Sequence, residues 1–164
     1  MNLLRAHQPG RWNVAVRFQP TGRLLAIALP LYFVWEMAQA PAFTGMPQGW
    51  WAATAVCALA ALGDGVIIVA LWALGTVLWR DVQWFVPPRW TRYAVVVLVG
   101  IALQATIEWI MVYRLGRWGY SPAHPLVPVV KIGALPVLQA VTLSPLAFWL
   151  TARWERATAR RSTM

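Results

Sequence analysis

The sequence predicts an all-α integral membrane protein, a four-helix transmembrane bundle with both termini in the cytoplasm. Three observations lead to this fold class: the composition, the apolar runs and the placement of the basic residues. Apolar residues make up 60% of the 164 residues and charged residues only 12%, whereas soluble chains carry about 25% charged residues. A composition this apolar is typical of a chain that is embedded in a lipid bilayer. We expect a single transmembrane domain over residues 1–164.

Four apolar runs are each near the roughly 20 residues that a helix needs to cross a bilayer. They cover residues 24–40, 51–79, 93–113 and 127–150. None shows the strict alternation of a membrane barrel strand, so we expect all four to be helices. Pro136 and Pro145 predict a kink in the fourth helix.

The basic residues are placed unevenly along the chain. Only Arg114, Arg117 and Lys131 lie in or near the third connection, with Lys131 expected just inside the fourth span. The other eleven lie in the basic tails 1–23 and 151–164 and in the second connection: Arg5, Arg11, Arg17, Arg23, Arg80, Arg89, Arg92, Arg153, Arg156, Arg160 and Arg161. Because cytoplasmic segments are the basic ones, we expect both termini inside and the protein in a bacterial inner membrane. The net charge of +9 then needs no nucleic-acid partner.

An A-x-A triplet, Ala38-Gln39-Ala40, follows the first apolar run and is typical of a signal-peptide cleavage site. The leader before that run, residues 1–23, is long for a signal peptide. Pro41 would follow the cut, and its fixed φ and missing N–H make a poor protease substrate. We therefore expect an uncut helix end at this triplet.

Three of the five acidic residues fall inside the expected spans: Glu36, Asp64 and Glu108. Each would cost at least about 2.5–3.5 kcal/mol at the centre of a helix that faces lipid. Ionisable residues in such places are therefore functional candidates. Carboxyl groups held in different environments can act as general acid and general base. We predict these three residues as the catalytic groups.

Polar residues at a similar depth predict a binding pocket in the outer half of the bundle. Helical spacing places Gln39 beside Glu36, and Gln104 beside Glu108. The predicted substrate-binding residues are Gln39, Gln104, Arg114, Arg117, Tyr120, Lys131 and Gln139. The cations among them would hold a polar head group. We expect a membrane lipid or a lipophilic small molecule as the ligand.

A structural interpretation of the same charges stays open. Glu108 with Arg114, or Glu36 with Lys131, could form ion pairs that fix the register of the helices. No metal is predicted, because the two histidines are expected on opposite sides of the membrane and the chain has no cysteine pair. No cofactor is predicted either.

Small residues recur every four positions along the second span, at Ala53, Cys57, Ala61 and Gly65. This spacing lets another helix approach closely. The approaching helix could belong to the same chain, to a second copy in a homo-oligomer, or to a larger membrane complex.

Three functions fit these observations. The first is a membrane enzyme that acts on a lipid or isoprenoid-like substrate by carboxylate acid/base chemistry. The second is a non-catalytic subunit or assembly partner of a larger membrane complex, and the third is a small carrier or proton pathway. Four helices with inward-facing carboxylates near one face are similar to the small membrane isomerases and sterol-binding proteins of the emopamil-binding type. The resemblance is one of architecture and assigns no role to an individual residue.

Overall fold

The computed structural model describes residues 14–161, with side chains from Pro20 onward. The outermost parts of the two predicted tails, 1–13 and 162–164, lie outside this range. Four long helices make up most of the chain: α1 (Val14–Gln39), α2 (Trp50–Trp79), α3 (Trp90–Trp109) and α4 (Ala134–Arg161). Short elements follow α1 and α3: η1 (Ala40–Ala42), β1 (Phe43–Thr44), η2 (Ile110–Arg114, a π-helical turn) and β2 (Gly119–Tyr120). All four long helices are long and apolar enough to cross a membrane, which confirms an all-α fold of the membrane type.

The fourth helix begins later than the sequence predicted. It starts at Ala134 rather than at residue 127, because a tight loop precedes it. Leu126 pairs with Gly133 across this loop, and two residues within it have positive φ, 73° at Val129 and 52° at Lys131. Residues in that conformation cannot continue a right-handed helix. The expectation that Lys131 lies in the first turn of the fourth span was therefore wrong.

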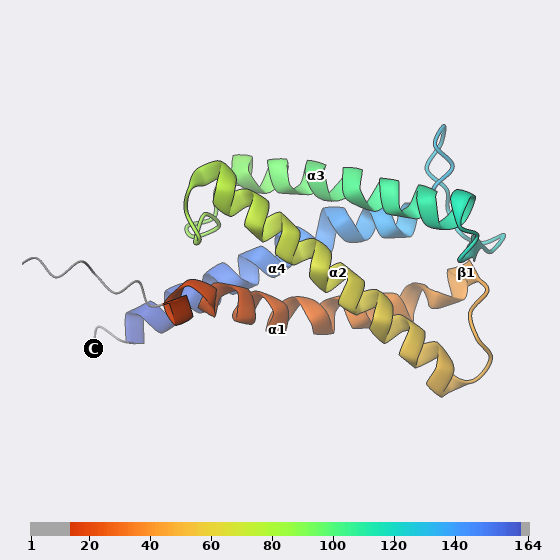
Figure 1. The fold of residues 1–164 in the computed structure, drawn as a ribbon, viewed down its shortest axis with the longest axis horizontal. Coiled ribbons are helices and arrows are strands. Elements are labelled where there is room, and N and C mark those ends of the chain that lie inside the picture. The colour runs from red at the N-terminus through yellow and green to blue at the C-terminus, as the bar shows by residue number, and fades with distance from the viewer. Residues whose placement is uncertain (1–13, 162–164) are drawn as a thin grey trace, which may run out of the picture.

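The helices run alternately up and down, so α1 begins and α4 ends at the same end of the bundle (Figure 1). We call this the terminal end, and the opposite end, which carries β1 and β2, the loop end. Three pairs of helices pack extensively: α1 with α2, α3 with α4, and α1 with α4. The fourth pair, α2 and α3, packs less. These two helices meet near their connection and diverge toward the loop end (Figure 1).

Aromatic side chains close the bundle at the terminal end. Trp84 and Phe85, in the connection between α2 and α3, are fully buried. The indole N–H of Trp84 donates to the backbone carbonyl of Trp72 at 3.1 Å, and both rings pack against Phe148. Gly75 makes room for this arrangement, since a Cβ atom at that position would collide with the ring of Trp84. The connection is therefore part of the core.

A cap joins the two connections at the loop end. β1 pairs with β2 antiparallel, with Phe43 opposite Tyr120. The amide of Ser121 donates to the carbonyl of Ala42 at 3.0 Å. Nδ1 of His124 lies 3.0 Å from the same carbonyl oxygen. These bonds fix the segment after α1 against the segment before α4.

The small-residue face of α2 packs inside the chain. Cys57, Ala61 and Gly65 are buried, and Ala53 is half-buried. A Cβ atom at Gly65 would lie only 2.8 Å from Cδ2 of Leu29 on α1. Of the three partners considered for this face, α1 of the same chain is the one that the structure shows against it.

Candidate functional site

A hydrogen-bonded network of two carboxyl and two amide side chains lies between three helices. Nε2 of Gln139 on α4 donates to Oδ2 of Asp64 on α2. Oε1 of Gln139 accepts from Nε2 of Gln39 on α1 at 3.5 Å, and the same nitrogen donates to Oε1 of Glu36 at 2.8 Å. The carboxyl groups of Glu36 and Asp64 lie within electrostatic range of each other. We call Glu36, Gln39, Asp64 and Gln139 the central network.

Local sequence features position these four groups. Glu36 and Gln39 are three residues apart on α1, so they share a helix face. The indole N–H of Trp35 donates to Oε1 of Gln39 at 3.0 Å and fixes the orientation of this amide. Both glutamines and Asp64 are buried, with Gln139 only 2% exposed. Buried amides are stable only when hydrogen-bonded, so each one holds the next in place.

A small polar cavity lies beside Asp64, where all four helices come together. Its volume is about 10 Å³, which is about the space that one water molecule needs. The polar side chains that line it are Tyr32, Asp64, Gln104, Gln139 and Ser144. The hydroxyl groups of Tyr32 and Ser144 lie 3.2 Å apart.

Tyr32 and Ser144 were not among the predicted site residues. Tyr32 lies four residues before Glu36, on the same helical face, and this spacing was the signal that could have identified it. Ser144 precedes Pro145 in an apolar run. A hydroxyl group next to a proline-interrupted helical turn is the corresponding signal for a cavity.

Glu108 belongs to a second cluster, which we call the cap cluster, with Trp118 and Tyr120. Oε2 of Glu108 accepts from the phenol of Tyr120 at 2.7 Å and from the indole of Trp118 at 3.5 Å. Glu108 is only 3% exposed. Burial, together with the hydrogen bond to Glu108, raises the pKa of Tyr120 above its ordinary value, so this phenol stays a donor. Glu108 also lies within electrostatic range of the central network.

The predicted cationic residues lie outside both clusters. Arg114, Arg117 and Lys131 are exposed at the loop end. The guanidinium of Arg114 stacks over the ring of Trp109 at 5.8 Å, and the backbone carbonyl of Lys131 accepts from the phenol of Tyr113 at 2.6 Å. Neither of the ion pairs considered from the sequence, Glu108 with Arg114 or Glu36 with Lys131, is present among residues 20–161.

The predicted site residues therefore divide into three groups. The central network brings together Glu36, Gln39, Asp64 and Gln139, and Gln104 lines the small cavity together with Asp64 and Gln139. Glu108 and Tyr120 meet in the cap cluster. Arg114, Arg117 and Lys131 are exposed and belong to neither cluster.

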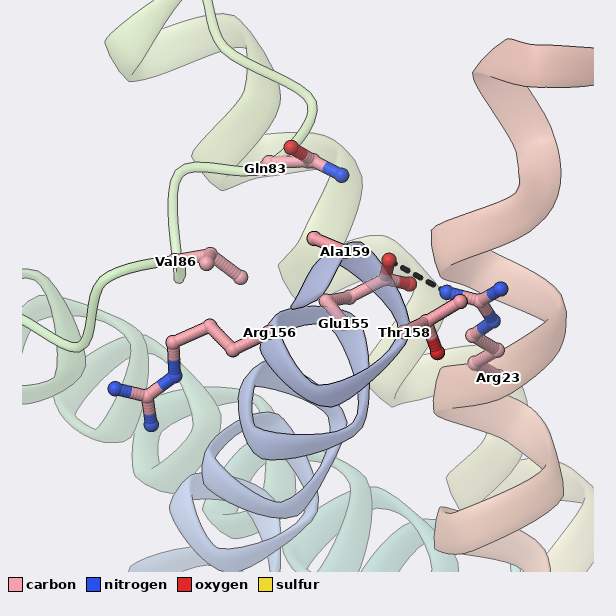
Figure 2. A pocket seen from close by; sticks show the side chains of 7 residues that line it. All are labelled: Arg23, Gln83, Val86, Glu155, Arg156, Thr158 and Ala159. Atoms are coloured by element: carbon pink, nitrogen blue, oxygen red, sulfur yellow. Dashed lines mark hydrogen bonds and ion pairs between the residues drawn. The ribbon is translucent and has the colours of Figure 1, made fainter. Parts of the chain in front are cut away.

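The ion pair in the described part of the chain lies at the other end of the bundle. The guanidinium of Arg23 on α1 donates to Glu155 on α4 at 2.6 Å, as Figure 2 shows. A hollow of about 260 Å³ lies beside this pair, lined also by Gln83 and Val86 from the α2–α3 connection and by Arg156. This pair joins α1 to α4 at the terminal end of the bundle and takes no part in the predicted site.

No group of three His, Cys, Asp or Glu side chains within the described residues could hold a metal ion. His124 in the cap is buried, and its Nε2 has no hydrogen-bond partner in the part of the chain that the structure describes. Phe43 and Tyr120 pack against its imidazole ring. We assign His124 to the packing of the cap.

Comparison with known proteins found no matching family model, no matching curated protein and no matching solved structure. The geometry of the two clusters therefore carries the functional argument. Each of the three carboxyl groups in the spans, Glu36, Asp64 and Glu108, is bound by an uncharged donor, an amide, a phenol or an indole. Such an arrangement leaves the carboxyl groups able to accept, hold and release protons.

Proposed function

We propose that the protein is a membrane enzyme that acts on a lipid or isoprenoid-like substrate, with Asp64 and Glu36 as its acid/base pair. One observation carries this proposal. Both carboxyl groups are inside an apolar bundle, and no basic side chain pairs with either of them among residues 20–161. Carboxyl groups in such places are costly for the fold, and a chemical role explains why they are kept.

The neighbouring amides suit this chemistry. The carboxyl groups of Glu36 and Asp64 lie within electrostatic range of each other, and we propose that one carries a proton while the other does not, so that the pair supplies one acid and one base. Gln139 donates to Asp64, and Gln39 donates to Glu36, which places the two carboxyl groups in different environments. A proton can then pass to one carbon or oxygen of the substrate while the partner carboxyl accepts another.

The substrate would enter sideways from the lipid. The cavity beside Asp64 has about the volume of one water molecule, whereas pockets for drug-sized ligands measure about 300–1,000 Å³. Binding therefore requires two helices to separate. The less extensive packing of α2 against α3 makes this pair the entrance that we propose, with Gln104 of α3 beside the cavity. Arg114, Arg117 and Lys131 at the loop end would hold an anionic head group.

We also propose that both termini are cytoplasmic and that the membrane is a bacterial inner membrane. The basic residues carry this orientation, as eleven of fourteen belong to the terminal end or the tails. An alkaline phosphatase inserted after Gly45 should be active, because the first connection would lie outside, and one fused to Met164 should be inactive. The reverse pattern would contradict the orientation and leave the chemistry of the site untouched.

A genetic complementation experiment tests the enzymatic proposal. The gene is deleted in the source organism and restored as wild type, Asp64→Asn or Asp81→Asn, and the lipid extracts are compared by mass spectrometry. Asp81 lies exposed in the α2–α3 connection and serves as the matched control. We expect wild type and Asp81→Asn to restore one lipid that is missing from the deletion strain. A folded Asp64→Asn protein should not restore it. Full restoration by Asp64→Asn would rule out the acid/base role.

The second candidate is an assembly partner of a larger membrane complex. One observation favours it: Leu59, Leu62 and Val66 form an exposed apolar stripe on α2, with Val66 70% exposed. Such a stripe faces either lipid or another helix. A substitution in the stripe such as Leu62→Trp should prevent a partner subunit from copurifying with the protein. The Asp64→Asn variant should still copurify with that partner. Retention of the same partners by both variants would count against this candidate.

A further inference from the structure

We propose that the cavity beside Asp64 binds a single monovalent cation of the size of Na⁺, through oxygen atoms of Tyr32, Asp64, Gln104 and Ser144. The proposal does not depend on the enzymatic function, because cation binding can be measured without a substrate. Three features of the cavity carry it: its size, its lining and its charge.

The size and lining suit a small hard cation. The volume of about 10 Å³ is about that of one probe sphere, and a bare Na⁺ ion is smaller than a water molecule, so the cavity can hold one. Every polar side chain that lines the cavity offers an oxygen atom. Hard cations prefer oxygen ligands from carboxylates, amides and hydroxyl groups. The cavity has no sulfur or imidazole group in its lining, so a softer transition metal does not suit it.

The charge of the site favours a cation over a water molecule. Asp64 has no basic partner in the described part of the chain, and the neutral amide of Gln139 donates to it. A water molecule would leave the charge of an Asp64 carboxylate uncompensated inside the bundle, where charge is costly. A monovalent cation neutralises that carboxylate and adds no net positive charge to the site.

One further oxygen atom is available beside the carboxylate. Gln104 lines the cavity, and its side chain makes no hydrogen bond to another described residue. Its amide oxygen is therefore free to coordinate a cation.

Direct binding of ²²Na⁺ to the purified full-length protein in detergent tests the proposal. The expected result is saturable binding that unlabelled Na⁺ displaces and that choline does not. Ser144→Ala and Tyr32→Phe should each weaken binding by about tenfold or more, and Asp64→Asn should abolish it. Thr142→Val is the matched control on α4, because its hydroxyl bonds the carbonyl of Leu138 on its own exposed face; it should bind as wild type does.

Circular dichroism shows whether each variant is folded. If Asp64→Asn fails to fold, Ser144→Ala and Tyr32→Phe decide the question, since each removes a hydroxyl group only. Folded wild-type protein that binds no ²²Na⁺, equal displacement by choline and Na⁺, or wild-type affinity in both hydroxyl variants would each overturn the proposal. A failed lipid complementation together with intact Na⁺ binding would overturn the enzymatic function alone.

Discussion

Gln139 holds Asp64 across the centre of the bundle, with its amide nitrogen 2.5 Å from Oδ2 of the carboxylate. The other end of the same amide accepts from Gln39. The side chain of Gln139 on α4 therefore binds Asp64 of α2 through its nitrogen and Gln39 of α1 through its oxygen. Because lipid offers no hydrogen bonds to replace these, the position of α2 relative to α1 and α4 depends on this residue.

Gln139→Leu should destabilise the bundle. The substitution keeps the approximate size of the side chain, leaves Asp64 without the amide donor of Gln139, and removes one of the two acceptors of Gln39. Hydrogen bonds between membrane helices contribute about 0.6 kcal/mol on average and at most about 1.7, so we expect a loss of about 1–2 kcal/mol in the free energy of unfolding. Unfolding in detergent, followed by circular dichroism, measures it. Equal stability of Gln139→Leu and the Thr142→Val control would contradict the structural role of Gln139.

Two glycines of α2 should respond oppositely to alanine. At Gly75 the added Cβ meets the ring of Trp84, whereas at Gly63 it meets nothing within 4 Å. Overpacking costs about 1–3 kcal/mol, so Gly75→Ala should lower the thermal midpoint. Gly63→Ala should be neutral or slightly stabilising, because alanine favours a helix over glycine by up to about 1 kcal/mol. Similar midpoints for the two variants would show that Trp84 does not pack against Gly75.

Tyr120 should make stability depend on pH in alkaline solution. Its pKa is raised in the folded protein above the ordinary value of about 10, so the unfolded chain loses this proton first. The contribution of the phenol is complete below about pH 10 and is lost as the pH rises toward the folded value. The stability advantage of wild type over Tyr120→Phe should therefore shrink above about pH 10. An advantage that is unchanged, or that grows with pH, would show that Glu108 and burial do not act on Tyr120 in this way.

Most of the fold followed from local sequence features. The lengths of the apolar runs predicted α2 and α3 closely, because run length alone reports whether a helix can cross a bilayer. The end of α1 was also predicted, but this helix begins at Val14 rather than at residue 24. The start of α4 was missed, since hydropathy does not distinguish the apolar residues of a tight loop from those of a helix. Val129 is apolar yet has a positive φ, and this conformation depends on the pairing of Leu126 with Gly133.

The candidate site was predictable where helical spacing decides it. Glu36 and Gln39 share a face, and so do Gln104 and Glu108, and in both cases the members point into the bundle. The long cationic side chains were harder to place, because Arg114 can reach either a buried carboxylate or the ring of Trp109, and its sequence position does not select between them. Spacing along the chain also says nothing about contacts between helices, such as that of Ser144 with Tyr32.

The measurement that tests the proposed chemistry most directly is solvent deuterium incorporation into lipid. Membranes are prepared from the source organism after deletion of the gene. They are incubated in heavy water with wild-type protein, with Asp64→Asn or with Asp81→Asn, and the masses of the lipids are measured by mass spectrometry. Proton transfer to carbon at the Glu36–Asp64 pair should give one lipid species that gains deuterium with wild type and Asp81→Asn only. Identical lipid masses and abundances in all three incubations, with folded protein in each, would contradict an acid/base enzyme of this kind.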